Sequence, residues 1–262
     1  DDSNLTVRVS LTGTNAVAGD SVQMQNGTTA LGTAVTLTAA HITAGFVDIA
    51  TGTLAEGAVA LNAKVIDSAG NSSAASASTN VTVDTTAPGA PEVPAVFDDV
   101  GSVTGNRVFN SAITDDNNPT FRLDLAGTGA MAGDKVQFLN GSSLLATEVV
   151  LTAADIAAGQ VDVNPGSLAD GAYSMRIRIV DLVGNIGTAV GPILFSVDTV
   201  APSAPTITSV TDDVAQITGA LTAGGLTNDN NLTVRVSLTG TNAVAGDSVQ
   251  LFNGTNSTGT AV

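Results

Sequence analysis

The sequence repeats itself, and this repetition limits the possible folds more than any other feature. The stretch NLTVRVSLTGTNAVAGDSVQ at residues 4–23 recurs letter for letter at residues 231–250. A diverged copy, NPTFRLDLAGTGAMAGDKVQ, lies between them at residues 118–137. Successive copies start 114 and then 113 residues apart. Because this period matches the size of an ordinary domain, the sequence predicts tandem domains of a single type.

A second repeated motif marks the domain boundaries. VDTTAPGAP at residues 83–91 returns as VDTVAPSAP at residues 197–205, and proline favours extended chain in such linkers. We therefore divide the chain into three parts. Residues 1–87 are interpreted as a repeat without its N-terminal part, residues 88–200 as a complete repeat, and residues 201–262 as a repeat without its C-terminal half. This arrangement is typical of a window from a longer array.

Short strand patterns separated by turns run through the complete repeat. Residues 120–127 (TFRLDLAG) and 172–181 (AYSMRIRIVD) alternate apolar and polar side chains, as half-buried strands do. Asn140–Gly141 predicts the turn of a hairpin. About seven strands in roughly 110 residues indicate an all-β fold, a sandwich of two sheets.

One short helical turn interrupts this strand pattern. Thr152 and Asp155 have the spacing of a helix-capping box, and Gly159 is placed to end the helix.

The one-residue difference between the two repeat periods falls near residues 106–114, which we interpret as a loop that tolerates an insertion.

Composition excludes several classes of function. Twenty-four acidic residues face eight basic ones, for a net charge of −16, which argues against nucleic acid or an anionic membrane surface as a partner. The chain has no cysteine, so we expect neither disulfides nor thiolate metal sites. We see no apolar run long enough to span a membrane and no signal peptide, and we expect no membrane insertion.

The sequence predicts that the chain is not an enzyme. His41 is its only histidine and aligns with Asp155 of the next copy, so we interpret it as a helix surface residue. No Ser/His/Asp or Cys/His set can be assembled, and no phosphate-binding glycine loop precedes a helix.

Several motifs together resemble a known family. The linker VDTTAPGAP, the segment DDVGSVTG, the stretch LADGAYSMRIRIVDLVGN and the Asp-x-x-Gly-Asn turn are similar to the bacterial immunoglobulin-like (Ig-like) repeats of giant surface adhesins. Those adhesins are secreted by the type I pathway and belong to the RTX or Bap-like group. The resemblance covers the whole chain. It implies tandem Ig-like β-sandwiches that hold a distal adhesive domain away from a bacterial cell and are stiffened by Ca²⁺ between domains.

The predicted topology gathers acidic residues at one end of each sandwich, here called the lower end. In an Ig-like sandwich the first strand ends where the second begins, and the last strand finishes at the same end. Carboxylates and amide oxygens in loops suit Ca²⁺, and the absence of His and Cys disfavours transition metals. The predicted metal ligands at this end of the three repeats, in chain order, are Asp1, Asp2 and Asp84, then Asp98, Asp99, Asp115, Asp116 and Asp198, then Asp212, Asp213 and Asp229.

A further turn is predicted at the opposite, upper end. Asp181 and Asn185 are expected to join Asp1, Asp2 and Asp84 at the first junction between repeats. Asp67 and Asn71 occupy the same positions in the first repeat and are expected to serve a preceding domain. Against this interpretation, an isolated Asp-Asp pair or Asp-x-x-Gly-Asn turn forms a turn more often than it binds a metal. Asp20, Asp134 and Asp247 are interpreted as such turn residues.

The expected function is that of extender repeats of an extracellular, cell-surface adhesin with a role in adhesion and biofilm. The expected partners are neighbouring repeats of the same chain. One alternative is a subunit of an extracellular filament or surface layer, in which other copies of the chain are also partners. Another is a module that binds glycans or surfaces, which the low content of aromatic residues disfavours.

Overall fold

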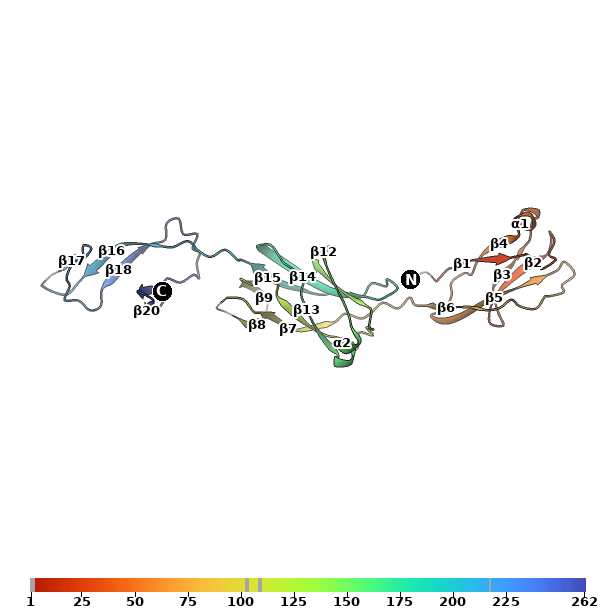
Figure 1. Ribbon diagram of the computed structural model, residues 1–262, viewed down its shortest axis with the longest axis horizontal. Coiled ribbons are helices and arrows are strands. Elements are labelled where there is room, and N and C mark those ends of the chain that lie inside the picture. The colour runs from red at the N-terminus through yellow and green to blue at the C-terminus, as the bar shows by residue number, and fades with distance from the viewer. Residues whose placement is uncertain (1–2, 102–103, 108–109, 217) are drawn as a thin grey trace. The chain divides into compact units, whose positions relative to one another are not determined.

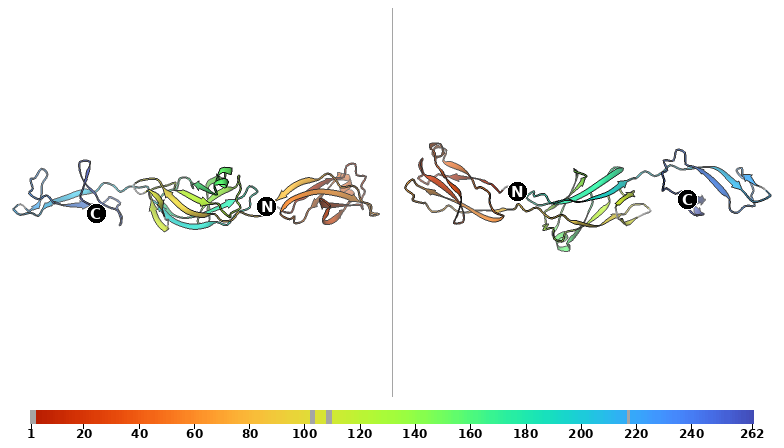
Figure 2. Two further views of the ribbon diagram at one scale, coloured as in Figure 1. Left: turned by 90° about the horizontal axis from the view of Figure 1, so that it is seen from below. Right: turned by 180° about the vertical axis from the view of Figure 1, so that it is seen from behind.

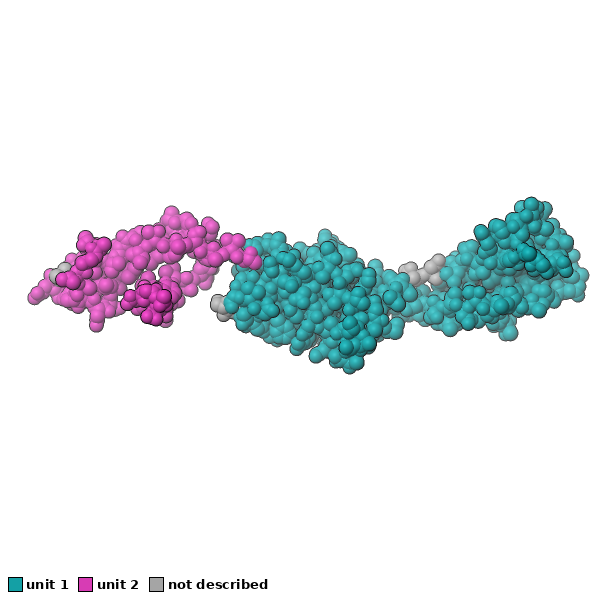
Figure 3. All heavy atoms as spheres, in the orientation of Figure 1, with its two compact units in different colours: residues 1–198 teal, residues 199–262 magenta. Residues whose placement is uncertain are grey.

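The structure, a computed structural model, describes residues 3–101, 104–107, 110–216 and 218–262 of the chain. It confirms the predicted all-β fold of Ig-like sandwiches, with a short helix in each of the first two repeats (Figure 1). The chain divides into two compact units, Asp1–Asp198 and Thr199–Val262 (Figure 3). Two separate apolar cores lie inside the first unit, one drawn from residues 5–83 and the other from residues 93–197. The boundaries at 87/88 and 200/201 stay a prediction.

The second repeat is built from two sheets that pack face to face (Figure 2). One sheet has the order β13-β10-β7-β8 and the other β12-β11-β14-β15-β9. The strands are β7 (Glu92–Asp98), β8 (Gly105–Arg107), β9 (Asn110–Thr114), β10 (Thr120–Asp124), β11 (Lys135–Asn140), β12 (Ser143–Val150), β13 (Gln160–Val163), β14 (Gly171–Val180) and β15 (Val190–Val197).

Period-two alternation explains how the core of this repeat fills. On β14 the side chains of Met175, Ile177 and Ile179 are fully buried, whereas the arginines between them stay partly exposed. Phe121 of β10 lies against Phe138 of β11, with ring centroids 5.8 Å apart in a tilted arrangement. The chain has no tryptophan, so phenylalanines supply the buried aromatic rings of this core, and Phe195 also lies against Phe121, with ring centroids 6.3 Å apart.

Part of the predicted loop at residues 106–114 is wrong, because this segment contains strands. β8 pairs with the end of β7, and β9 pairs with the last strand β15 in parallel. The first strand β7 stays in one sheet with β8, and the chain crosses to the other sheet between β8 and β9. The sequence pattern did not reveal this crossing, because the two short strands GNR and NSAIT have no clear alternation.

The first repeat contains the corresponding elements from residue 6 onward. They are β1 (Thr6–Ser10), β2 (Ser21–Asn26), β3 (Thr29–Thr36), α1 (Ala39–Ala44), β4 (Phe46–Ala50), β5 (Gly57–Ile66) and β6 (Thr79–Val83). One sheet of this repeat has the strand order β3-β2-β5-β6. Among the described residues β1 pairs only with β4, whereas its counterpart β10 pairs with β13 and also with β7.

The two helices begin and end as their sequences predict. In α2 (Ala153–Ala158) the Thr152 hydroxyl accepts the Asp155 N–H at 3.2 Å, and the Asp155 carboxylate accepts the Thr152 N–H at 2.8 Å. Gly159 ends this helix in the left-handed conformation, at φ 67°. In α1 the ring Nδ1 of His41 accepts the N–H of Thr38 at 3.2 Å. The only histidine thus caps a helix.

The hairpin turn lies one residue later than predicted. Asn140 and Ser143 are paired, so the two-residue loop of the β11–β12 hairpin is Gly141–Ser142 rather than Asn140–Gly141. Gly141 has φ 61°, whereas Ser142 is not among the residues with positive φ, so the pair suits a type II′ turn with glycine at its first central position. The side chain of Asn140 accepts the N–H of Ser174 on the neighbouring strand at 2.9 Å. This contact is why the asparagine belongs to the strand.

The second unit holds shorter strands. They are β16 (Thr206–Asp212), β17 (Gly219–Ala220), β18 (Thr233–Ser237), β19 (Leu251–Asn253) and β20 (Asn256–Thr258). β16, β17 and β18 form a sheet of order β17-β16-β18, and β19 pairs with β20. Among the residues that the structure describes, no helix is long and apolar enough to cross a membrane.

We expect truncation of the inter-sheet phenylalanine contact to destabilise the second repeat. Phe138→Ala removes a fully buried ring and leaves a cavity, which costs about 3–5 kcal/mol of unfolding free energy. Leu182→Ala is the control, because this side chain is 77% exposed and its loss should change stability by less than about 0.5 kcal/mol. Urea unfolding of both variants measures the difference. Equal stabilities would contradict the assignment of Phe138 to the core.

Candidate metal-binding ends of the repeats

Three strand ends meet at the lower end of the second repeat. The hydroxyl of Thr114, the last residue of β9, donates to Asp98 Oδ2 at 2.7 Å at the end of β7. The N–H of Asp198, which follows β15, donates to the carbonyl of Thr114 at 2.9 Å. Thr114 Oγ1 also accepts the N–H of Asp116 at 3.1 Å. One threonine thus ties together the segments that carry the predicted acidic residues.

Asp116 is the most unusual of these acids. Its side chain is 2% exposed, and Oδ1 accepts the N–H of Asn118 at 2.7 Å. Its other oxygen, Oδ2, is buried without a hydrogen-bond partner. Burial raises the pKa of Asp116, the backbone N–H groups of Asn118 and Asp99 oppose this shift, and the nearby charges of Asp99 and Asp98 add to it. None of the ion pairs among the described residues involves Asp116.

Asp115 lies directly against the loop that follows β7. Gly101 has φ +71°, and a Cβ atom added to it would lie 1.8 Å from Asp115 Oδ2. Only glycine leaves room for this carboxylate, so the loop after β7 and the segment before β10 are packed together. Asp99 and Asp198 are exposed at the same end of the repeat. All five acids predicted for this end therefore belong to segments that are in contact.

The oxygen atoms at this end are of the type that a hard cation prefers, but they do not form a ready-made ligand group. Within residues 3–101, 104–107, 110–216 and 218–262, no three His, Cys, Asp or Glu side chains are grouped as metal ligands. The buried, unpartnered oxygen of Asp116 and the carboxylate seated on Gly101 nevertheless fit a site that supplies oxygen to Ca²⁺. Binding would require small side-chain movements of the exposed acids.

The same arrangement recurs in the second unit. The hydroxyl of Thr227 donates to Asp212 Oδ2 at 2.6 Å and accepts the N–H of Asp229 at 3.0 Å. Asp212 and Asp229 are 1% and 6% exposed. Asp213 is exposed, and its N–H lies 3.4 Å from Asp229 Oδ2. A pair of buried aspartates bridged by a threonine is therefore a repeated feature of the chain.

At the upper end of the second repeat, the Asp181 turn is largely satisfied by its own backbone. Asp181 Oδ1 accepts the N–H groups of Val183, Gly184 and Asn185 at 2.7–3.0 Å. Burial alone would raise the pKa of Asp181, but the hydrogen bonds from Asn185 and its neighbours hold it below its usual value. Turn formation accounts for this carboxylate without a metal.

Asn185 connects this turn to the linker from the first repeat. Its side-chain NH₂ donates to the carbonyl of Asp84 at 3.0 Å and to Asp181 Oδ2 at 2.6 Å. The structure thus brings Asp84, Asp181 and Asn185 together, as predicted. The amide group of Asn185 is used as a donor here, whereas the prediction expected its carbonyl to face a cation. Asp1 and Asp2, predicted for the same junction, lie outside the described residues.

The corresponding turn of the first repeat has the same internal bonding. Asp67 Oδ1 accepts the N–H of Asn71 at 2.7 Å, and Oδ2 accepts its side-chain NH₂ at 2.8 Å. These hydrogen bonds lower the pKa of Asp67. Asp67 is half-buried and Asn71 is exposed, and their metal role stays a prediction.

Three features of the site were missed from the sequence. The threonine bridges were overlooked, although Thr114 and Thr227 each stand two residues before a buried aspartate, in TDD and TND. The packing of Gly101 against Asp115 has no sequence signal beyond the glycine itself. Asp134 is 1% exposed with an unpartnered Oδ1, whereas Asp20 at the same position of the first repeat accepts the Ser68 N–H at 3.2 Å.

Comparison with known proteins supports the fold of the complete repeat. A family model for bacterial Ig-like domains matches residues 91–199. No curated protein matches the chain. Among solved structures, the fibronectin(III)-like modules of Clostridium thermocellum CbhA align at 15% identity and a TM-score of 0.40, covering 74% of this chain and 85% of that one.

A second solved structure is a putative membrane anchored protein from Corynebacterium diphtheriae. It aligns at 10% identity and a TM-score of 0.27 over 79% of this chain, which spans 51% of the length of that protein. These structural likenesses are too distant to carry an argument about function. The family match is the stronger finding: it supports a bacterial Ig-like domain over residues 91–199, a type of domain that is not typically enzymatic.

Because the pKa of Asp116 is raised, we expect the free energy of unfolding, measured in the presence of chelator, to depend on pH. Between its usual pKa and the raised value, the Asp116 carboxyl group binds more protons in the folded state than in the unfolded state. The stability of the folded state therefore falls as the pH rises through this range. Asp116→Asn removes this penalty. We expect the variant to be more stable than the natural protein at neutral pH, with the difference vanishing at acidic pH.

Urea unfolding across this pH range in the presence of chelator measures the effect. Asp48→Asn is the matched control, since this exposed carboxylate pairs with Arg8 at 2.8 Å and its pKa is lowered. The control should lose rather than gain stability at neutral pH. A destabilised Asp116→Asn variant at neutral pH would contradict the unpaired state of this carboxylate.

Proposed function

We propose that this chain is a set of extender repeats from a bacterial cell-surface protein, and that Ca²⁺ bound at the lower ends of the repeats stiffens it. One observation carries the proposal: a threonine-bridged pair of buried aspartates stands at the lower end of two successive repeats, and in the second repeat one carboxylate oxygen has no partner. That end leads in sequence into the next linker, through Asp198. The proposed location is extracellular, on the cell surface.

Electrostatics support a cation at this position. A buried carboxylate costs free energy unless it is neutralised or paired. The chain has only eight Lys and Arg residues, and the described ion pairs use three of them with acids elsewhere: Arg8, Arg122 and Lys135. The residues that would hold the ion are Asp98, Asp99, Asp115, Asp116 and Asp198. Ca²⁺ accepts six to eight oxygen ligands in irregular geometry, which suits loop carboxylates.

Contacts of the linker with the second repeat support a spacer role. The N–H of Gly89 donates to the carbonyl of Thr128 at 2.7 Å. A Cβ added to Gly187 would lie 2.5 Å from the carbonyl oxygen of Pro88. In the second unit the N–H of Ser203 donates to the carbonyl of Thr241 in the same way, at 2.8 Å. Each linker is thus bonded to the repeat that follows it.

The positions of the aromatic residues disfavour a glycan-binding module. Phe121, Phe138 and Phe195 are buried in the core of the second repeat. Phe46 and Phe97 are covered by arginines, with the guanidinium carbons of Arg8 and Arg122 3.9 and 5.0 Å from the ring centres. Sugar platforms need exposed rings, and these five are unavailable for that purpose, whereas Phe252 of the second unit is 62% exposed.

Calcium should stabilise the protein through the lower-end acids. At a hundredfold excess over the dissociation constant, a ligand that binds only the folded state adds about 2.7 kcal/mol of stability. We expect Ca²⁺ to raise the melting temperature of the natural protein relative to chelator, and Asp116→Asn to reduce this increase. Calorimetry measures both effects. The charge-matched control Asp48→Asn should keep the full response.

Calcium should also restrict the arrangement of the repeats. We expect small-angle scattering in millimolar Ca²⁺ to give a narrower distribution of particle lengths than in chelator. Asp198→Ala should weaken the effect at one junction while leaving the melting temperature in chelator nearly unchanged, because this side chain is exposed. An identical length distribution with and without Ca²⁺ would refute the stiffening role, even if the ion binds.

A further inference from the structure

The linker between the first two repeats, residues 84–89, is bonded to the second repeat at both ends. It follows β6 directly. The side-chain NH₂ of Asn185 donates to the carbonyl of Asp84 at 3.0 Å. At the other end of the linker, the N–H of Gly89 donates to the carbonyl of Thr128 at 2.7 Å. The second repeat therefore fixes the linker at its first and last residues.

The first repeat also holds this linker. Glu56 lies in the loop before β5, and its Oε2 accepts the N–H and the hydroxyl of Thr85, both at 2.8 Å. These hydrogen bonds hold the pKa of Glu56 below its usual value, so the acceptor is a carboxylate at neutral pH and the bonds are charge-assisted. Thr85 is the neighbour of Asp84, so side chains from both repeats hold adjacent residues of the linker.

A glycine of the second repeat makes room for the linker. A Cβ atom on Gly187 would lie 2.5 Å from the carbonyl oxygen of Pro88 and 2.7 Å from that of Ile179. The first repeat has Ser73 at this position, and Ser73 bonds to Val65 of its own sheet through its N–H at 2.8 Å and its hydroxyl at 3.0 Å. The sandwich thus accepts a side chain at this position, whereas the linker as seated on the second repeat does not.

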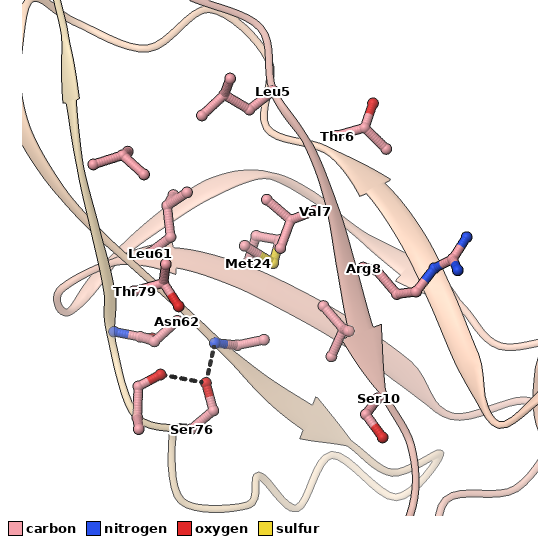
Figure 4. A pocket seen from close by; sticks show the side chains of 14 residues that line it. Leu5, Thr6, Val7, Arg8, Ser10, Met24, Leu61, Asn62, Ser76 and Thr79 are labelled. Carbon is pink, nitrogen blue, oxygen red and sulfur yellow. Dashed lines mark hydrogen bonds between the residues drawn. The ribbon is translucent and has the colours of Figure 1, made fainter.

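A second serine of the first repeat bonds to the same sheet. The hydroxyl of Ser76 accepts the N–H of Ala63 at 3.1 Å and donates to the carbonyl of Ala77 at 3.1 Å (Figure 4). The second repeat has Val190 at this position, just as it has Gly187 in place of the first serine. The seat of the linker is therefore specific to the sequence of the second repeat.

We propose that residues 84–89 form a strap that locks the first junction without a metal ion, and that Glu56 and Asn185 are the residues that position it. Each single hydrogen bond stabilises little, but bonds at both ends of a short segment restrict all of it. Pro88 restricts the segment further, because its ring fixes φ.

The strap and a cation at the Asp181 turn are alternatives. The NH₂ of Asn185 donates to two oxygen atoms, the carbonyl of Asp84 and Oδ2 of Asp181, the second at 2.6 Å. A cation shared with these aspartates would need the amide oxygen in this place. The amide would then have to turn around, which breaks both bonds of the strap.

Spin labels on the two helices test the strap in the whole chain, which has no natural cysteine. Ala40→Cys in α1 and Ala154→Cys in α2 place labels at equivalent, exposed positions of the first two repeats. Pulsed electron paramagnetic resonance measures the distribution of distances between the labels. We expect a narrow distribution in chelator and no further narrowing in millimolar Ca²⁺.

Two variants remove the seat of the strap. Asn185→Ala should broaden the distribution in chelator, because the linker loses its bond to the second repeat. The matched control is Asn71→Ala, which removes the same bond within the turn of the first repeat, to Asp67 at 2.8 Å, and should leave the distribution unchanged. Gly187→Ser should also broaden it by displacing Pro88, and this variant should fold because the first repeat carries serine there. Calorimetry checks that each variant melts cooperatively.

Amide exchange at Thr85 distinguishes a strap from separate local contacts. Glu56→Ala removes the acceptor of this N–H from an exposed loop and should speed its exchange several-fold. Asn185→Ala should speed the same exchange, although its own bond is to Asp84, because the whole segment is released. Two-dimensional NMR in chelator measures both rates.

The strap is overturned if the distance distribution in chelator is broad and narrows only with Ca²⁺, or if Asn185→Ala and Asn71→Ala behave alike. It is also overturned if Asn185→Ala leaves the exchange at Thr85 unchanged. The proposed calcium role can stand or fall separately, because it is tested by the thermal response of Asp116→Asn at the lower end of the second repeat.

Discussion

The pairing of buried aspartates through a threonine hydroxyl governs the lower end of the second repeat and recurs in the second unit. Thr114 bonds to Asp98 and Asp116 and also, through its carbonyl, to Asp198. The ends of β7 and β9 are thereby fixed next to the end of β15, which is distant from both in the sequence. The bonding holds two carboxylates inside the protein but leaves Asp116 Oδ2 without a partner. The fold thus maintains an excess of negative charge exactly where a repeat ends and a linker begins, and this excess makes a cation a physically reasonable partner.

Much of the fold followed from the sequence because the strands of the complete repeat are amphipathic. Alternation located β10 and β14, and capping residues located α2. The crossing of the chain from one sheet to the other between β8 and β9 was not predicted, because β9 is short and its pairing with β15 depends on a partner about 80 residues away. Local patterns report which face of a strand is buried. They do not report which sheet edge a short segment joins.

The candidate site was predicted unevenly for a related reason. Topology alone indicated that Asp98, Asp116 and Asp198 belong to one end of the repeat, and their segments do meet there. The burial of Asp98 and Asp116 and the exposure of Asp99 and Asp115 depend on the threonine bridge and on Gly101, which no pattern of acidic residues reveals. The satisfied state of Asp181 depends on three backbone N–H groups of its own turn, so the same Asp-x-x-Gly-Asn motif can serve a turn with or without an ion.

The near-identity of the first and third copies has a consequence beyond the fold of either. Two segments with the same sequence compete for the same strand partner, and the register that suits one suits the other. In a tandem array with such similar copies, correct pairing therefore depends on which strand is nearest, because the side chains of β1 and β18 cannot distinguish between donors.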